Sequence, residues 1–431
     1  MNFKPILAAG LLLAAVSALA QDASLKVWTL EECIAYADTN NISLKMSRNT
    51  YASGLESTGQ AKAAMLPSVS ANVSQGVSNS PAAGTTSYNG SYGISAGMTL
   101  WNGGRLRNSL LQQQALNTVD SLSVEESRMS LKADITQAYI NCLYAAESVK
   151  AAESSLEASK AQRDRAEQLL KVGTISKVDF AQLQSQYVSE QYKLTTAQNS
   201  HATCLLQLKQ LLELDIMDEI LLADFEADES EVLAPIPDKA TVYADAMNTM
   251  PQVLSGEYST KAAEYSLKQA EAGMLPSVGL NAGVQTGNGS VSSESFGTQL
   301  GNNFGESIGL SVSIPIFSNR QNRTAVNKAR LALENTRLSQ RNTEKTVLKA
   351  VESAYLDATA AQLQYVAARE KEKYARESYD LTYEQFGVGR KNTVELITAQ
   401  NELTSAVQGA IQAKYTALMN RRILEIYQGK I

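Results

Sequence analysis

The feature that most constrains the fold is a segment without glycine or proline between Arg105 and Lys171. As one helix, at about 1.5 Å per residue, it would be about 100 Å long. Small and apolar residues recur along it at alternating spacings of four and three, the pattern of a coiled-coil seam. The seam comprises Leu131, Ile135, Ala138, Cys142, Ala145, Val149, Ala152, Leu156, Ser159, Arg163, Ala166 and Leu170. We therefore expect this segment to pack lengthwise against other long helices.

The same organisation recurs further along the chain. The motif MLPSV occurs at Met65–Val69 and at Met274–Val278, and YAD at Tyr36–Asp38 and Tyr243–Asp245. A second seam comprises Val347, Val351, Ala354, Ala358, Ala361, Tyr365, Ala368, Glu372, Ala375, Tyr379, Thr382 and Phe386. Because the matches keep their order, we infer an internal duplication. The predicted divisions are a signal peptide at 1–20, a first repeat at 21–230 and a second repeat at 231–431.

The signal peptide is predicted from one lysine, an apolar run and the small residues Ala-Leu-Ala at the end of that run. A membrane anchor or a buried helix is the alternative, but the run is too short to span a bilayer comfortably. Export would place Cys33, Cys142 and Cys204 in an oxidising compartment. Their odd number and wide spacing do not indicate a disulfide framework, so we interpret them as small buried side chains.

Four segments alternate aliphatic residues with Ser, Gly, Thr and Asn, which predicts strands. The predicted strands are about 68–79, 88–101, 277–288 and 304–317. A soluble sandwich also alternates, but two hairpins cannot close a barrel or bury both faces alone. We therefore expect several chains to form one transmembrane β-barrel. Trp101 and Phe317, at two strand ends, are where aromatic residues of the membrane interface would lie.

One glycine follows each long seam. Aligning AYINCLYAA (138–146) with AYLDATAAQ (354–362) places Gly173 on Gly389. We predict that each ends its helix in a left-handed turn, which glycine adopts cheaply. Ser176 and Asn392 are suited to cap the helix that follows. Each repeat would then hold an antiparallel helical hairpin far from its β-hairpin, with tips at 171–177 and 387–393.

Taken together, these features resemble the TolC-like outer-membrane efflux channels. The motifs that carry the resemblance are LLKVGTISKVDFAQLQSQ, QFGVGRKNTVELITAQNEL, MLPSV twice, and LWNGGR at Leu100–Arg105. The resemblance implies a mainly α-helical chain with a membrane β-barrel part, in which each of two repeats pairs a β-hairpin with a coiled-coil α-hairpin. It implies a homotrimer with a twelve-stranded barrel in the lipid of a Gram-negative outer membrane and a twelve-helix barrel in the periplasm.

The resemblance also implies a passive exit duct of a tripartite efflux or type I secretion system. A periplasmic adaptor, coupled to an inner-membrane pump of the RND, ABC or a similar class, would open the helix tips. The implied gate residues are Asp179 and Lys391, as the acidic partner in the first tip and the basic partner in the second, together with Glu395, Phe386 and Thr398. The implied adaptor-docking residues are Val172, Gly173, Thr174, Val388, Gly389 and Arg390. Lys391, Phe386 and Thr398 depart from the family's usual arginine, aromatic hydroxyl and acid, which weakens the expected closing network.

Other classes of protein find less support in the sequence. The chain has one histidine, His201, and shows no metal-ligand spacing, phosphate loop or nucleophile motif, so we predict neither an enzyme nor a bound cofactor. A net charge of −6 without Lys/Arg clusters argues against nucleic-acid binding. The acidic run Ala223–Glu231 resembles a solvated linker, although it is suited to cations. The remaining alternative is a soluble periplasmic coiled-coil adaptor or structural protein.

Overall fold

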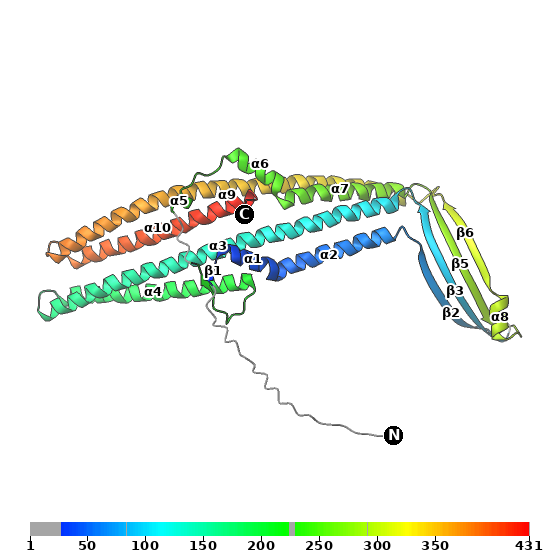
Figure 1. Cartoon of the computed structure of the whole chain (residues 1–431), viewed down its shortest axis with the longest axis horizontal. Helices are drawn as coiled ribbons and strands as arrows, with labels where there is room; N and C mark the ends of the chain where they lie inside the picture. The colour runs from blue at the N-terminus through cyan, green and yellow to red at the C-terminus, as the bar shows by residue number, and fades with distance from the viewer. Residues whose placement is uncertain (1–26, 83, 224–228, 291, 431) are drawn as a thin grey trace, which may run out of the picture.

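The computed structural model describes residues 27–82, 84–223, 229–290 and 292–430, so the signal peptide predicted at 1–20 lies outside the described residues. The molecule is a long helical bundle with a β-sheet at one end and two helix tips at the other (Figure 1). Its elements are β1 Val27–Trp28, α1 Leu30–Asn40, α2 Ile42–Ala63, β2 Ser68–Ser80, β3 Thr85–Trp101, α3 Arg105–Lys171, α4 Lys177–Leu212, β4 Leu221–Leu222, α5 Glu229–Val232, α6 Lys239–Thr249, α7 Pro251–Ala272, β5 Ser277–Gly289, α8 Phe296–Asn302, β6 Gly305–Ser313, α9 Gln321–Gly387 and α10 Thr393–Tyr427.

The two halves of the chain repeat the same elements. The helices α3 and α9 have 67 residues each, α2 and α7 have 22 each, and the strands β2 and β5 have 13 each. Each half pairs a β-hairpin with a long helical hairpin, which confirms the twofold repeat inferred from the motifs. In the described part of the chain, no helix has both the length and the hydropathy needed to cross a membrane.

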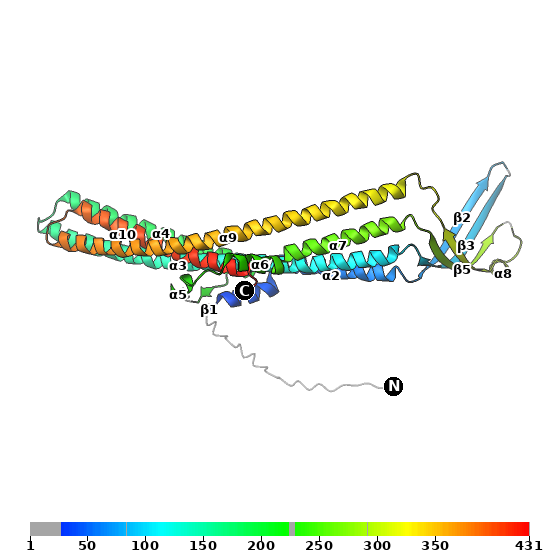
Figure 2. The ribbon, with the colours of Figure 1, turned by 90° about the horizontal axis from the view of Figure 1, so that it is seen from above.

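The bundle has a different helix order in its two halves. Next to the sheet, α3 packs between α2 and α7, and α7 contacts α9 (Figure 2). Toward the tips, α3 packs between α4 and α10, and α10 contacts α9 (Figure 1). The predicted seams lie in these contacts, because Ala152 and Ala166 of α3 and Ala358 of α9 are buried. Arg163 interrupts the first seam, and its guanidinium stacks 4.4 Å from the ring centre of Tyr187 on α4.

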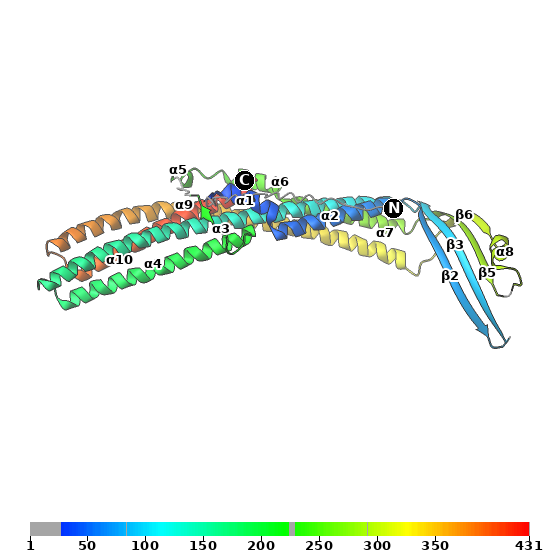
Figure 3. The same cartoon turned by 60° about the horizontal axis from the view of Figure 1, so that its bottom comes forward.

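The sheet has the order β2-β3-β5-β6, with neighbouring strands antiparallel, and it lies obliquely to the helices (Figure 3). Ile94 is paired with Ala71 on one side and Val284 on the other. Because directly paired residues share a face, the aliphatic residues of the four strands form one continuous face. Their Ser, Gly and Asn neighbours form the opposite face. The strands β2 and β6 are the two edges of this sheet.

Two details in and beside the sheet differ from the sequence prediction. The strand predicted at 304–317 ends at Ser313, where its partner β5 begins at Ser277. Pro315 follows and has no backbone N–H to continue the ladder, so Phe317 lies beyond the strand. The short helix α8 was not predicted; Ser295 caps it by accepting a hydrogen bond from the Thr298 backbone.

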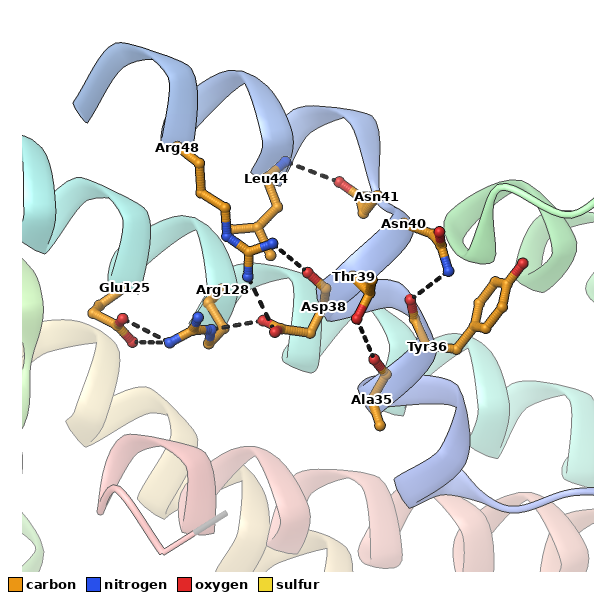
Figure 4. A network of polar contacts seen from close by, with 10 residues as sticks. All are labelled: Ala35, Tyr36, Asp38, Thr39, Asn40, Asn41, Leu44, Arg48, Glu125 and Arg128. Carbon is orange, nitrogen blue, oxygen red and sulfur yellow. Dashed lines mark hydrogen bonds and ion pairs between the residues drawn. The ribbon is translucent and has the colours of Figure 1, made fainter. Parts of the chain in front are cut away.

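A polar network ties the first three helices together at mid-length (Figure 4). Asp38 at the end of α1 accepts hydrogen bonds from Arg128 Nε of α3 at 2.7 Å and from Arg48 Nη2 of α2 at 3.1 Å. Arg128 also pairs with Glu125 at 2.6 Å. Burial acts to raise the pKa of Asp38, but the hydrogen bonds and charges of Arg128 and Arg48 outweigh it and lower the pKa.

Replacing Asp38 with asparagine is expected to destabilise this junction by about 1 kcal/mol, because the paired side chains are about a third exposed and screened. Since the folded-state pKa of Asp38 is lowered, the stabilisation is complete above the unfolded pKa of about 3.9 and is lost as pH falls through the lower folded value. Denaturant unfolding, followed by helical circular dichroism, should therefore separate the variant from the wild type at pH 7 but not in strong acid. Asp245→Asn, at the corresponding motif of the second repeat, is the control; equal losses in both variants would contradict the assignment.

Candidate functional site at the helix tips

The two tips have the same backbone structure. Gly173 has a φ of 78° and Gly389 a φ of 74°, so both adopt the predicted left-handed conformation. The N–H of Thr174 donates to the Leu169 carbonyl at 2.9 Å, and the N–H of Arg390 donates to Gln385 at 2.9 Å. These bonds close each long helix in a Schellman-type turn. Space around both glycines is open, so the backbone angle alone requires glycine there.

Each returning helix begins with a side-chain cap. Ser176 Oγ accepts from the Asp179 N–H at 3.1 Å at the start of α4. Asn392 Oδ1 accepts from the Glu395 N–H at 2.9 Å, and Glu395 Oε2 accepts from the Asn392 N–H at 3.0 Å. This reciprocal pair is a capping box. Both carboxylates lie in a first helical turn, where the helix dipole favours negative charge.

Asp179 connects the two tips. Its carboxylate accepts a hydrogen bond from the Ser176 hydroxyl at 2.6 Å and lies near the hydroxyl of Thr393, the first residue of α10. The Ser176 hydroxyl, and after it the Thr393 hydroxyl, hold the pKa of Asp179 below its ordinary value. Thr393 is 4% exposed and was not among the candidate residues taken from the sequence.

Lys391 pairs within its own tip. Its Nζ lies 2.5 Å from Glu395 Oε1, one helical turn away. The Lys391 hydrogen bond, and then the Asn392 backbone, lower the pKa of Glu395. Within one chain the structure therefore joins Lys391 to Glu395 and Asp179 to Thr393, whereas the resemblance implied that Asp179 and Lys391 were partners. Lys391 and Glu395 therefore neutralise each other within the second tip.

The other candidate residues surround this contact. Phe386 is half-buried in the last turn of α9. The Thr398 hydroxyl donates to the Val394 carbonyl of its own helix at 2.8 Å. Val172 and Val388 are 71% and 72% exposed at equivalent positions of the two turns. The tips therefore present matching apolar side chains to solvent.

A buried polar layer separates the two helical hairpins above the tips. Gln400 of α10 donates to Ser159 Oγ of α3 at 2.8 Å. Gln162 of α3 donates to the Tyr379 hydroxyl of α9 at 2.9 Å. Gln186 of α4 donates to Asn401 Oδ1 of α10 at 2.9 Å. The hairpins thus meet through amides and hydroxyls here, where an aliphatic seam would pack more stably.

Glu190 is the charged member of this layer. It is 1% exposed, and its Oε1 accepts from Gln186 at 2.7 Å and from Lys193 at 2.9 Å. In the described part of the chain, Glu190 Oε2 and the side-chain oxygens of Gln162 and Gln400 are buried without a hydrogen-bond partner. Each such atom costs about 1–3 kcal/mol. Gln186 and Glu190 continue the coiled-coil spacing from Leu183, a signal in the sequence that would have located this layer.

Both a protein-family model and individual sequences of known proteins match this chain over most of its length. The family model described as "Outer membrane efflux protein" matches residues 34–213 and 242–429. The outer membrane efflux protein BepC of Brucella suis is 25% identical over 407 residues, covering 91% of this chain and 83% of that protein. Outer membrane protein TolC of Escherichia coli is 23% identical over 393 residues, covering 89% of this chain and 79% of that protein.

Solved structures show the same architecture. A crystal structure of CusC superposes with a TM-score of 0.83 at 18% identity, covering 94% of this chain and 92% of that one. The CmeC outer membrane channel of Campylobacter jejuni superposes with a TM-score of 0.77 at 19% identity, covering 93% and 85%. Both repeats and both tips fall inside the matched region, which sets aside the soluble-adaptor alternative. The chain belongs to the outer membrane efflux protein family and is a non-enzymatic efflux channel of the outer membrane that extends into the periplasm and works with other efflux components.

Proposed function

We propose that three copies of the chain assemble into one exit duct. The observation that carries this proposal is the four-stranded sheet, which has two open edges and one exposed aliphatic face. Pairing β6 of each copy with β2 of the next closes three such sheets into a barrel whose aliphatic face contacts lipid. Exposed leucines on the edge helix α9, including Leu331, Leu356 and Leu363, supply apolar surface for the adjoining copy.

The tips are the proposed gate of this duct. The Asp179–Thr393 contact holds the end of the second hairpin against the first, and repetition around a threefold axis multiplies this weak contact by three. Lys391 and Glu395 fix the start of α10, while Phe386 and Thr398 flank it. The incompletely satisfied layer around Glu190 lowers the stability of the closed packing above the gate. Opening separates the hairpins along this layer.

A periplasmic adaptor, attached to an inner-membrane pump of the RND, ABC or a similar class, is the proposed partner of the tips. Val172 and Val388 are exposed at equivalent places, beside Gly173–Thr174 and Gly389–Arg390. Because each chain exposes two equivalent valines, a trimer offers the adaptor six similar apolar contacts. The duct itself is passive, so the pump supplies the energy for export.

The double variant Val172→Asp/Val388→Asp is expected to lose adaptor binding by at least roughly tenfold, because it places a carboxylate in each apolar contact. The measurement is the amount of adaptor that co-purifies with a tagged channel after chemical cross-linking in cells. The trimer and its conductance should stay unchanged. Met217→Asp, at an apolar position after α4 that is even more exposed, is the control. Undiminished adaptor in the double variant would contradict tip docking.

A further inference from the structure

The three cysteines of the chain converge on one place in the fold. Cys33 of α1 and Cys142 of α3 lie in the main hydrophobic cluster, and Cys204 of α4 packs against it. Cys142 and Cys204 are the same number of residues from Gly173, the tip of the hairpin that α3 and α4 form. Antiparallel packing of the two helices therefore sets these two cysteines side by side.

The two thiols are close enough to influence each other: the Cys204 thiol, after burial, raises the pKa of Cys142, and Cys33 of the same cluster adds to it. Cys142 and Cys204 are free thiols in the structure. Cys142 is fully buried and Cys204 is half-buried. The second hairpin has no counterpart, because the positions equivalent to Cys142 and Cys204 are Ala358 and Asn420. There the helices are joined instead by Asn420 Nδ2, which donates to the Asp357 carbonyl at 3.3 Å.

We propose that Cys142 and Cys204 are a disulfide-forming pair that links α3 to α4 in the exported protein. The periplasm that the helices occupy is an oxidising compartment, in which adjacent thiols form and keep disulfides. The link would fix the first helical hairpin in register and leave the second without one. The first hairpin then becomes the rigid member against which the second moves.

The oxidant belongs to the class of periplasmic dithiol oxidants in their disulfide form. The more accessible Cys204 thiolate attacks that disulfide, forms a mixed disulfide and releases one thiol of the oxidant. Cys142 then gives up its proton and attacks the Cys204 sulfur, which releases the second thiol. Two protons and two electrons pass from the pair to the oxidant. Burial, together with the neighbouring thiols, raises the pKa of Cys142, so the bond forms most readily before the cluster is packed.

The test traps thiols in protein taken from outer membranes. Cells are lysed and the protein denatured in N-ethylmaleimide, then reduced and labelled with an isotopically heavy maleimide, and each cysteine is read by mass spectrometry. We expect the heavy label on Cys142 and Cys204 and the light label on Cys33. Light label on all three cysteines, or a link between Cys33 and Cys142, would overturn the proposal.

Two variants control for folding. Cys204→Ala changes the half-buried member, and it should move Cys142 from the heavy to the light label. Cys33→Ala should leave the link intact. A second readout is thermal unfolding: a reductant should lower the midpoint of the wild type and leave that of Cys204→Ala unchanged. A wild-type midpoint that does not respond to reductant would also contradict the link.

Discussion

Replacing Ile94 with arginine is expected to abolish the folded channel in the outer membrane. Ile94 lies near the middle of the inner strand β3, between Ala71 and Val284 on the aliphatic face. An arginine at the bilayer midplane of a β-barrel costs about 2–4 kcal/mol. Three copies in a trimer raise this to roughly 6–12 kcal/mol, which rivals the stability of a whole domain. The measurement is the amount of heat-resistant trimer in purified outer membranes.

Ser95→Arg is the matched control for this variant. Ser95 is the next residue of the same strand and faces the opposite side of the sheet, with its hydroxyl 3.0 Å from that of Ser70. Its arginine would lie in the water-filled bore, so the trimer should persist. Equal loss of trimer in both variants, or loss only in Ser95→Arg, would contradict the assignment of the two faces.

The second large effect is expected from Asp179→Ala/Thr393→Ala. Removing the contact between the tips frees the second hairpin from the first. A contact between a buried hydroxyl and a partly exposed carboxylate contributes about 0.5 kcal/mol, so three copies contribute roughly 1.5 kcal/mol. That shifts the ratio of open to closed channels by roughly tenfold. Single-channel recording in planar bilayers measures this ratio directly.

Thr196→Ala provides the control for this recording. Thr196 is exposed on α4, and its hydroxyl bonds only the Tyr192 carbonyl of its own helix at 3.0 Å. The control should gate as the wild type does. A double variant with wild-type open probability would assign the closed state to other contacts, with Lys391 and Glu395 as the next pair to remove.

Local and repetitive patterns in the sequence predicted much of this fold. The seam spacing predicted both long helices, which have 67 residues each, and the two glycines predicted both turns. These features depend only on residues close together in the sequence. The strand β6 ends earlier than predicted because its partner β5 begins at Ser277. The residue pattern of β6 alone does not contain that information. The unpredicted helix α8 is seven residues long, too short for a reliable periodicity.

The site was harder to predict because its contacts join distant segments. In the sequence, Thr393 is an ordinary first residue of a helix. Only the packing of α10 against α4 brings it close to Asp179. The resemblance implied that Lys391 pairs with Asp179 of the other tip, whereas within one chain Lys391 pairs with Glu395, one turn away. The coiled-coil spacing of Gln186 and Glu190 marks one helix of the polar layer, but which residues of the other three helices meet them is set by tertiary packing.

The most direct test of the account is a reversible lock on the tips. Asp179→Cys/Thr393→Cys, in a chain whose own cysteines are alanine, places two thiols at neighbouring positions of the two tips. In planar bilayers the oxidised protein should show almost no openings, and a reductant should restore wild-type gating. Full conductance in the oxidised protein would contradict the tip gate, and the absence of any channel after reduction would contradict the duct itself.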